Sequence, residues 1–547
     1  MTLDDTSGNS IKSNILTLLK SYDHPDAESW AELISGKPPQ VRLAIIHKLI
    51  PDAFLSPGVR TLHDELSDHY PELMRILEGT TAYYTAFPTN GIPSQAFSID
   101  AHVDPQFNAG IGMAKTETGD ILLNPRFRDI FDMLRTEEID EKTWTRLRNS
   151  VFKYNNGLGA PWYREVALRR YLRDGESDPT TLESIRKALR IKPVPTYGGT
   201  TGLSVALDIG VGEECRLILP RTYWGNINLK LAHRRAIKDV GDYIDTEGNI
   251  HPDILWKQIS RAKKEGFPKV AVYFNFPHNP TGIVPTREQA VELEDIIQNS
   301  ADENFQIIVL CDEPYYPFVR GKDVIRVPFS YYMKPGNNRN ILTFSSINGT
   351  KRDGMYGMRH SDLFILTPEN VSDDALKLFE KRVLAGYMRG AFSFSCALSQ
   401  YLLARSITDD PLIAIRKNDE IRMSKSFFEE EKKLVDYVEQ SVNSTIGVLD
   451  QIDDLQRITG RDDTNAYGGF FVTYKLSERL TKEGITSIDL HKAGLKNNCG
   501  IISTNGLIRI SGLVSADNDK QFSENLRKTI EYAINEKKRN SFDEFMF

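Results

Sequence analysis

Cysteine is scarce in this sequence, and the positions of the few cysteines exclude two classes of protein. The 547 residues contain four, which lie far apart: Cys215, Cys311, Cys396 and Cys499. They show neither the short spacing of zinc ligands nor the disulfide framework of a small secreted domain. We therefore predict reduced, mostly buried thiols and no metal site.

Long hydrophobic runs are also missing. No apolar stretch approaches the roughly 18 residues that a membrane-spanning helix needs. The N-terminal residues, MTLDDTSGNS, are acidic and polar. They lack the basic region and apolar core of a signal peptide and the arginine bias of a transit peptide. We expect a cytoplasmic protein that has no membrane partner.

Neither sign of charge is in large excess. The formal net charge is −7, which is ordinary for a globular protein of this size. Residues 1–100 contain 7 basic and 13 acidic side chains, a balance of 7 − 13 = −6, which argues against a head that binds nucleic acid. Helical spacing interrupted by prolines predicts a helical N-terminal extension over residues 1–95. Such an extension can pack against the body, cover a dimer surface, or close over an active site as a lid.

One polar loop carries the strongest sign of chemistry. Residues 345–362, SSINGTKRDGMYGMRHSD, lie between two apolar runs, Ile341–Phe344 and Leu363–Leu366, that predict buried strands. A lysine that leaves water becomes a better nucleophile and can form a Schiff base with a carbonyl, and Lys351 is the candidate. Arg359 can then hold a phosphate of the same cofactor through a bidentate fork. The pair indicates pyridoxal phosphate, and the alternative is a solvated Lys-Arg-Asp-Gly turn.

Three further apolar runs end near residues suited to the same cofactor. Trp224, Asn279 and Asp312 each follow a short run that predicts a buried strand, and the runs alternate with helical patterns. Ligands of such parallel sheets bind beyond the carboxyl ends of the strands. An aromatic ring there can stack on a pyridine ring, and a carboxylate can keep the pyridine nitrogen protonated. The alternatives are a core tryptophan, an Asn-Pro-Thr-Gly turn and an aspartate that caps a turn.

A glycine-rich turn, YGGTTG at residues 197–202, precedes another helical pattern. The free N–H groups and the positive dipole end of a helix N-terminus suit a phosphate. A turn of this kind is, however, more often only the start of a helix. The turn alone therefore leaves both interpretations open.

In this order over residues 105–515, the motifs resemble those of the class I aminotransferases, the aspartate and aromatic amino acid branch of the fold-type I pyridoxal-phosphate enzymes. The resemblance implies an α/β fold: a large domain whose mostly parallel sheet is sandwiched by helices, and a smaller α+β domain. It places the N-terminal part of the small domain at residues 96–150, the large cofactor-binding domain at 151–390 and the C-terminal small domain at 391–547. The acidic extension is a departure from the family pattern, and so is Asn348, which stands where the family usually has serine.

The resemblance also implies a role for each motif residue. The catalytic residues would be Lys351, which carries the cofactor, Asp312 at the ring nitrogen and the stacking Trp224. Further cofactor contacts would come from Gly199, Thr200, Thr201, Asn279, Tyr315, Thr350, Arg359 and, from the neighbouring subunit, Tyr154. The substrate would meet Gly112, Asn279, Arg509, which would grip its α-carboxylate, and Arg389, which would favour an acidic side chain.

The function implied is an aminotransferase that moves an amino group from an L-amino acid to a 2-oxo acid through a Schiff base on Lys351. The shared phosphate contact implies a homodimer, and no nucleic-acid partner is expected. A lyase, decarboxylase or cyclising enzyme that uses the same cofactor is the first alternative. A ligand-sensing regulator on the same fold would need a DNA-binding head, which the acidic N-terminal segment disfavours.

Overall fold

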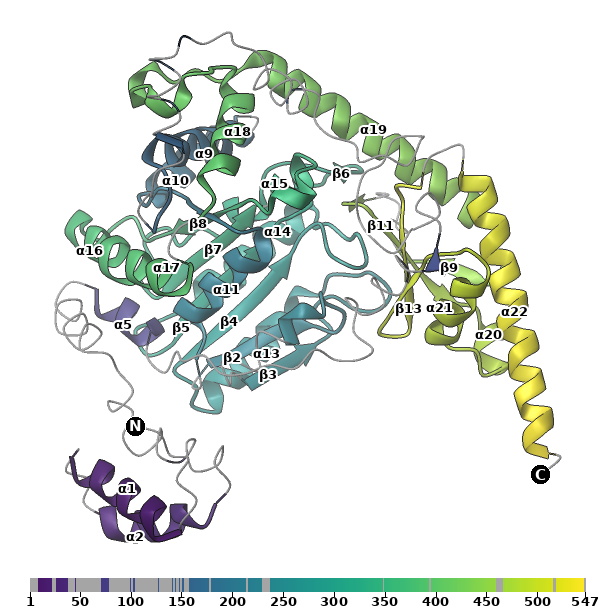
Figure 1. The fold of residues 1–547 in the computed structure, drawn as a ribbon, viewed down its shortest axis with the longest axis horizontal. Helices are drawn as coiled ribbons and strands as arrows, with labels where there is room; N and C mark the ends of the chain where they lie inside the picture. The colour runs from purple at the N-terminus through teal and green to yellow at the C-terminus, as the bar shows by residue number, and fades with distance from the viewer. Residues whose placement is uncertain are drawn as a thin grey trace. The chain divides into compact units, whose positions relative to one another are not determined.

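The computed structural model describes residues 8–21, 26–37, 45, 70–77, 99, 102–103, 126, 140, 143, 147, 150–151, 157–176, 179–212, 215–228, 237–347, 349–392, 395–458, 466–514 and 518–545 (Figure 1). The chain forms two compact units, Met1–Pro71 and Glu72–Phe547. In the first unit, helices α1 (Gly8–Ser21) and α2 (Ala27–Ser35) pack on a small apolar core of their own.

A seven-stranded sheet forms the centre of the second unit. Its strands are β1 (Val194–Thr196), β2 (Cys215–Pro220), β3 (Ile237–Gly241), β4 (Lys269–Asn275), β5 (Gln306–Asp312), β7 (Ile341–Ile347) and β8 (Ser361–Leu366), in the order β1-β8-β7-β5-β4-β2-β3. The neighbours from β7 to β3 are parallel, and β8 is antiparallel to both β7 and β1. The carboxyl ends of β2, β4, β5 and β7 therefore share one edge, as the predicted α/β fold requires.

Helices cover both faces of this sheet. On one face α11 (Gly199–Gly210) comes so close that a Cβ atom on Gly210 would lie 2.8 Å from Cγ2 of Ile308. On the other face, α13 (Pro252–Lys264) and α14 (Arg287–Ser300) share an apolar core with the alternate residues of β4 and β5. Helix α14 begins at a capping box formed by Thr286 and Gln289.

The second sheet is smaller and antiparallel. Its strands β12 (Ile502–Thr504), β13 (Leu507–Ser511), β11 (Phe471–Leu476) and β9 (Leu455–Arg457) share a core with helices α19 (Lys425–Leu449), α21 (Ser487–Lys496) and α22 (Asp519–Phe545). Figure 1 shows α19, in green, running from the helices near α18 (Ala397–Thr408) to this sheet. A two-stranded ribbon of β6 (Val319–Arg320) and β10 (Tyr467–Gly468) also links the two sheet regions.

The long linking helix is shorter at its start than its sequence pattern predicts. Charged residues around an apolar stripe predict one helix over residues 411–440. Two short 3-10 turns occupy the first part, Ile413–Ile415 and Asn418–Glu420. The helix begins after Ser424, whose hydroxyl accepts a hydrogen bond of 3.3 Å from the backbone N–H of Phe427. A good N-cap at Ser424 therefore decides where α19 starts.

Part of the predicted N-terminal extension packs at the opposite edge of the large sheet from Lys351. Helix α5 (Pro71–Leu77) lies at the amino ends of the strands, because the ammonium of Lys269, the first residue of β4, donates to the backbone carbonyls of Arg75 (3.0 Å) and Ile76 (2.5 Å). Arg339 also pairs with Glu72 at 3.3 Å. This stretch of the extension packs against the body rather than serving as a lid.

The remaining helices surround these elements: α9 (Pro161–Asp174), α10 (Pro179–Ala188), α16 (Asp373–Leu378), a π-helical turn (Phe379–Leu384), α17 (Ala385–Phe392) and α20 (Glu478–Lys482). None of the described helices is long and apolar enough to cross a bilayer. The predicted domain boundaries at residues 95 and 150 fall where the structure describes only scattered residues, so they stay predictions.

Candidate active site

Four of the predicted site residues lie where parallel strands of the large sheet end. Trp224 follows β2, Asn279 follows β4 and Asp312 is the last residue of β5. Lys351 lies after β7, in the short helix α15 (Gly349–Arg352). The chain therefore places these four residues at the carboxyl edge of the sheet, where ligands of parallel sheets bind.

The amine of Lys351 sits among aromatic rings and positive charges. Its Nζ atom lies 5.9 Å from the ring centroid of Tyr315 and 5.0 Å from that of Tyr356. Burial, together with the positive charges of Arg509 and Arg359, lowers the pKa of Lys351 to about 7. The lowered pKa makes the unprotonated amine, the form that a nucleophile or general base needs, more accessible near neutral pH.

The carboxylate of Asp312 is buried and held by a phenol. The hydroxyl of Tyr273, in the middle of β4, donates a hydrogen bond of 2.7 Å to Oδ2 of Asp312. Burial raises the pKa of Asp312 to about 7; the Tyr273 hydrogen bond acts against this rise, and Glu313 adds to it. The site therefore holds an acid and an amine whose pKa values both lie close to neutrality.

A chain of hydrogen bonds connects Asp312 to Arg509 of the smaller sheet. Asn275 donates to the backbone carbonyl of Asp312 at 2.7 Å and accepts from the backbone N–H of Asn279 at 2.7 Å. The side-chain oxygen of Asn279 accepts from Nη1 of Arg509 at 2.9 Å. The Arg509 guanidinium also lies over the ring of Phe471, 4.1 Å from its centroid, and burial lowers the pKa of Arg509 to about 10.

Tyr315, which follows β5, packs against residues of the smaller sheet region. Its ring meets those of Phe470 and Phe471 edge to face, at centroid distances of 5.2 and 5.5 Å. Gly469 has a φ of +76°, and a Cβ atom there would lie 3.1 Å from Cγ of Tyr315. The glycine therefore allows the backbone of the smaller domain to approach this tyrosine.

The predicted phosphate turn lies against Arg359. Gly199, Thr200 and Thr201 form the first turn of α11, and Gly198 precedes it with a φ of +78°. A Cβ atom on Gly198 would lie 2.9 Å from Nη2 of Arg359, so the exposed guanidinium lies beside the helix N-terminus. A cation and the positive end of a helix dipole together form a favourable place for an anion.

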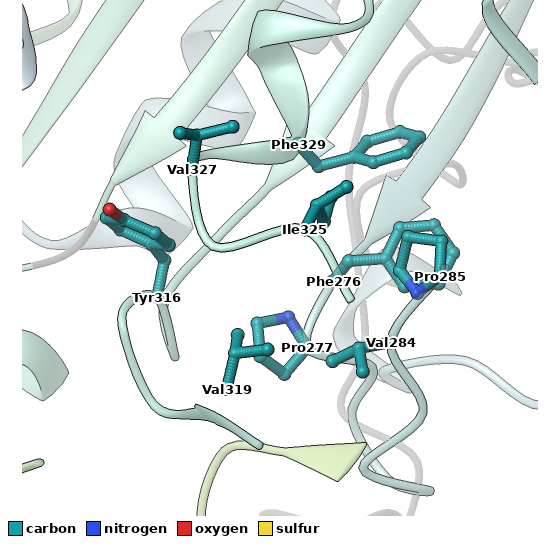
Figure 2. Close-up of a pocket in the computed structure, with 9 residues that line it drawn as sticks. All are labelled: Phe276, Pro277, Val284, Pro285, Tyr316, Val319, Ile325, Val327 and Phe329. Carbon is teal, nitrogen blue, oxygen red and sulfur yellow. The ribbon is translucent and has the colours of Figure 1, made fainter. Parts of the chain in front are cut away.

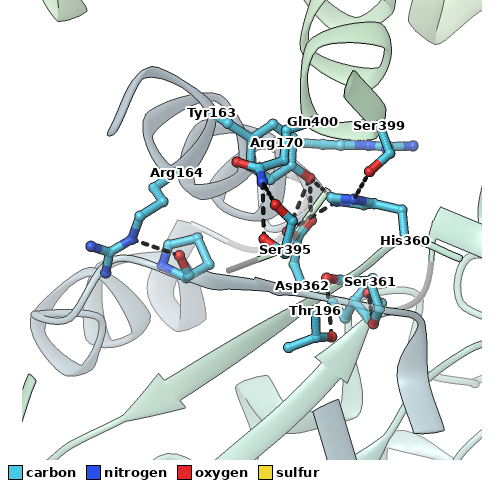
Figure 3. A network of polar contacts seen from close by, with 12 residues as sticks. Tyr163, Arg164, Arg170, Thr196, His360, Ser361, Asp362, Ser395, Ser399 and Gln400 are labelled. Atoms are coloured by element: carbon cyan, nitrogen blue, oxygen red, sulfur yellow. Dashed lines mark hydrogen bonds and ion pairs between the residues drawn. The ribbon is translucent and has the colours of Figure 1, made fainter. Parts of the chain in front are cut away.

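Thr350 holds the turn between Lys351 and Arg359. Its backbone N–H and its hydroxyl both donate to the carbonyl of His360, each at 3.1 Å. Figure 3 shows that the ring of His360 belongs to a further network. His360 Nε2 lies 2.6 Å from the hydroxyl of Tyr163, which donates to Asp362 at 2.8 Å, and His360 Nδ1 lies 3.3 Å from the hydroxyl of Ser399. The described contacts of Thr350 thus fix the backbone beside the lysine.

Three other predicted residues are not fully described by the structure. Gly112 and Tyr154 are outside the described residues, as is the side chain of Arg389, whose backbone belongs to α17. His278 beside Asn279 is buried, its Nδ1 lies 2.6 Å from the hydroxyl of Thr281, and burial lowers its pKa to about 4. It is a structural neighbour in the turn.

Two residues near the candidate site, Tyr273 and Tyr356, have no role predicted from the motifs. Tyr273 lies within an apolar run and is indistinguishable there from a core residue, and Tyr356 lies in the lysine loop without a predicted role. Strand alternation offers a signal for Tyr273, because residues two apart on a strand share a face and Asn275 is the partner of Asp312 in the sheet register.

A buried group of five charged residues includes Arg352 and Asp353, the two residues that follow Lys351 in the chain. Arg352 pairs with Asp174 through two bonds of 2.7 Å and with Glu431 at 2.7 Å. Arg170 pairs with Asp353 at 2.6 and 2.9 Å and with the same Glu431 at 2.6 Å. We call these five residues the paired-charge network. It connects helix α9, the lysine-bearing α15 and the beginning of α19.

A small hollow near the turn after β4 lacks the groups needed for chemistry. Figure 2 shows that its lining is apolar except for Tyr316; the lining residues are Phe276, Pro277, Val284, Pro285, Tyr316, Val319, Ile325, Val327 and Phe329. Lys351, Asp312 and Arg509 are not part of this lining. The candidate chemistry therefore belongs to the strand ends.

Comparisons with known proteins concern the family and the fold of this chain. The family described as aminotransferase class I and II matches residues 171–512. An aspartate aminotransferase of Bacillus sp. (strain YM-2) is 26% identical over 175 residues, which are 31% of this chain and 38% of that protein. A mitochondrial aspartate aminotransferase of Dictyostelium discoideum is 29% identical over 198 residues, 35% of this chain and 43% of that protein. The chain thus matches less than half the length of these relatives.

A solved structure extends the likeness to most of the fold. An aminotransferase from Anaerococcus prevotii superposes with a TM-score of 0.60 over 81% of this chain and 97% of that one, at 19% identity. At this identity the likeness concerns the fold alone, and it agrees with the α/β architecture predicted for this chain. The family match itself covers more than half of the chain. The chain therefore belongs to the aminotransferase class I and II family, as its motifs predict.

Proposed function

We propose that the protein is a pyridoxal-phosphate-dependent aminotransferase that moves an amino group from an L-amino acid to a 2-oxo acid. The observation that carries the proposal is the gathering of Lys351, Asp312 and Arg509 around one sheet edge, with the pKa of Lys351 lowered to about 7 by burial and by Arg509 and Arg359. An amine of this kind combines nucleophilicity with the capacity to carry a proton.

The described residues fit the cofactor. Arg359 approaches Gly198 so closely that a Cβ atom there would lie 2.9 Å from its Nη2, and this guanidinium beside the N-terminus of α11 suits a phosphate. Asp312 suits a protonated ring nitrogen, Asn279 and Tyr315 suit the ring hydroxyl, and Trp224 suits stacking on the ring. When bound, pyridoxal phosphate supplies a carbon that condenses with amines and a ring that draws electrons from the substrate Cα.

Residues of the chain would transfer the proton, bind the substrate and stabilise charge on the cofactor. Nζ of Lys351, whose pKa is lowered to about 7, would take the proton from the substrate Cα and deliver it again. Arg509, held by Asn279, would bind the substrate α-carboxylate through its fork. Asp312 would stabilise the positive charge on the ring nitrogen, which is worth more in a buried site than in water.

Further parts of the proposal are supported by the sequence resemblance. Gly112 would lie beside the substrate, and Arg389 would favour an acidic substrate side chain. Thr200, Thr201 and Thr350 would contribute to the phosphate site. The protein would work as a cytoplasmic homodimer in which Tyr154 reaches the phosphate of the partner subunit.

The test is the visible absorption of the purified protein with pyridoxal phosphate, recorded before and after adding single amino acids. We expect a cofactor band that depends on Lys351 and that one class of amino acid shifts, with one 2-oxo acid formed per cofactor. A second 2-oxo acid should restore the band. Lys351→Ala is the negative control. Lys433→Ala, which removes an exposed lysine, is the matched control and should keep the cofactor band. If the protein instead releases CO2 or ammonia from the amino acid, or converts it to a ring-closed product, the result would contradict the proposal.

Mixing two defective variants tests the shared site. Tyr154→Ala and Lys351→Ala are each expected to be impaired. A mixed dimer contains one site that combines Lys351 of one subunit with Tyr154 of the other, so mixing should restore part of the activity. No gain on mixing, with subunit exchange verified, would contradict shared sites.

A further inference from the structure

The carboxylate of Asp312 has an unusual companion in the middle of a strand. The phenol oxygen of Tyr273 lies 2.7 Å from Oδ2 of Asp312, and both side chains are buried. Within the part of the chain that the structure describes, Tyr273 is the side chain that donates a hydrogen bond to this carboxylate. One carboxylate oxygen is thus occupied by the protein and the other, Oδ1, remains for a second donor.

The sheet register makes this contact possible. In the parallel pair β4 and β5, Asn275 is the partner of Asp312 and Tyr273 is the partner of Leu310. Tyr273 therefore lies two positions before the neighbour of Asp312, on the same face of the sheet, and its long side chain reaches along the strand. Asn275 holds the backbone carbonyl of Asp312 at 2.7 Å, so both the backbone and the carboxylate of this residue are held.

The proton in this contact belongs to the tyrosine. Burial and the nearby Asp312 raise the pKa of Tyr273 well above its usual value, so the phenol stays protonated and remains a donor. Burial and Glu313 push Asp312 toward its neutral form, and the Tyr273 hydrogen bond opposes them. A donor to the charged form of a buried carboxyl favours that form and lowers the carboxyl pKa.

We propose that Tyr273 is a positioning residue for the reaction: its hydroxyl holds one oxygen of Asp312, favours the ionised form of that carboxylate and leaves the other oxygen for the ring nitrogen of the cofactor. The inference rests on the proposed function and deepens it. Tyr273 acts through Asp312 and touches neither the substrate nor the reacting atoms.

The chain offers a matched control for removing this hydroxyl. Tyr243 is also fully buried, and its hydroxyl donates to the backbone carbonyl of Tyr273 rather than to Asp312. Tyr273→Phe and Tyr243→Phe each remove one buried oxygen from the same part of the core. A general loosening of the sheet would affect both variants, whereas an effect through Asp312 would appear in Tyr273→Phe alone.

The first readout needs no cofactor. The infrared carboxyl stretch of Asp312, assigned by its loss in Asp312→Asn, is followed against pH in the cofactor-free protein. Removing a donor to the charged form raises a carboxyl pKa. We expect the midpoint to rise by about one to two pH units in Tyr273→Phe, the shift that a hydrogen bond to a charged group produces, and to stay unchanged in Tyr243→Phe. An unshifted midpoint in Tyr273→Phe, or an equal shift in both variants, overturns the proposal.

The second readout uses the holoenzyme. Tyr273→Phe should bind pyridoxal phosphate about tenfold more weakly and lower kcat about tenfold with little change in the substrate KM, since Arg509 is untouched. In an Asp312→Asn background the same change should have no further effect, because Tyr273 acts through that carboxylate. An equally large effect in that background overturns the proposal.

The two proposals fail in different ways. If the wild type neither binds pyridoxal phosphate nor exchanges amino groups, the proposed function falls, and the role of Tyr273 in it falls too. If the wild type is active and Tyr273→Phe matches it in both readouts, the role of Tyr273 alone falls.

Discussion

Two groups of buried charges adjoin the lysine-bearing helix α15, and the pKa of Glu431 in one is shifted in the opposite direction from that of Asp312 in the other. In the paired-charge network, Arg352 and Arg170 lower the pKa of Glu431 to about 2 although burial acts against them. In the candidate site, burial raises the pKa of Asp312 to about 7 and lowers that of Lys351 to about 7. Adjacent residues in the sequence, Lys351 and Arg352, thus belong to environments of opposite character.

The difference lies in what the chain supplies as partners. The five side chains of the network are only 1% to 11% exposed, and bidentate arginine–carboxylate pairs offset the loss of water. In the site, burial is the largest cause of each shift and acts toward the neutral form. A closed network stabilises charge for the fold, whereas the site keeps groups that change protonation near neutral pH.

The largest expected effect separates function from fold. Asp312→Asn should lower the amino-transfer rate by about 10³-fold or more, because a buried charge at the ring nitrogen is lost. The free energy of unfolding at pH 8 should not fall, since the wild type must ionise a buried carboxyl at that pH. Steady-state kinetics and urea unfolding of the cofactor-free protein measure the two quantities.

The exposed Asp253→Asn serves as the control for this change, because Asp253 pairs with Lys257 on the surface of α13. It should alter neither quantity appreciably. A rate within tenfold of the wild type in Asp312→Asn would remove Asp312 from the mechanism.

In the paired-charge network we expect a substitution to lower the free energy of unfolding. Glu431→Ala should lower the free energy of unfolding by about 3 to 5 kcal/mol, because Arg170 and Arg352 both lose a buried carboxylate acceptor and each keeps only its own aspartate. The next residue, Glu430, pairs with Lys433 near the surface, and Glu430→Ala should cost less than about 1 kcal/mol. Urea unfolding at pH 7 compares them, and equal losses would mean that burial of the network contributes little.

A third substitution tests how much the burial of the Glu313 carboxyl costs in stability when that carboxyl ionises. Burial raises the pKa of Glu313 to about 7, against hydrogen bonds from Ser330 and Ser345. Its contribution to stability is present below the ordinary value of 4.5 and is lost as the pH rises through 7, because the unfolded chain ionises first. Glu313→Gln, which is neutral at every pH, should therefore gain about 2 to 3 kcal/mol relative to the wild type between pH 5 and pH 8.

The control for Glu313→Gln is the exposed Glu524→Gln, which should follow the wild type across the same pH range. Urea unfolding at the two pH values gives the difference directly. A constant difference between Glu313→Gln and the wild type would show that Glu313 is ionised in the folded protein throughout.

The strands and their polar ends are predictable because each carries a local signal. Apolar runs that precede Asn279, Asp312 and Lys351 predict buried parallel strands. The structure places all three residues at one edge of the sheet. The glycine turn before α11 is equally local. These features depend on neighbours in the chain, so their position follows from patterns of a few residues.

The rest depends on contacts between distant segments. Arg352 and Asp353 fit a solvated turn by sequence, yet both are buried, because their partners come from α9 and from Glu431 on α19. Tyr273 is predictable only as core until β5 places Asp312 beside it. Similarly, Lys269 at the start of β4 gives no sign that it binds the carbonyl end of α5. No local pattern encodes such pairings, since their energy arises from removing both partners from water together.

The smallest expected effect concerns the lysine itself. After burial, the positive charge of Arg509 is the next cause of the lowered pKa of Lys351. Removing a neighbouring positive charge favours the ammonium form, so Arg509→Gln should raise the midpoint of Lys351 from about 7 by about one pH unit. Because burial remains, the midpoint should stay well below 10.5.

The measurement is the rate at which Lys351 reacts with an amine reagent in the cofactor-free protein, followed by mass spectrometry of its peptide between pH 5 and pH 10. Arg221→Gln, which removes an exposed arginine paired with Asp242, is the control and should leave the midpoint in place. A midpoint near 10.5 in the wild type would place Lys351 among ordinary solvated lysines and abolish the contrast with the network. A midpoint near 7 that Arg509→Gln leaves unmoved would assign the whole shift to burial, and Arg509 would then act on the substrate alone.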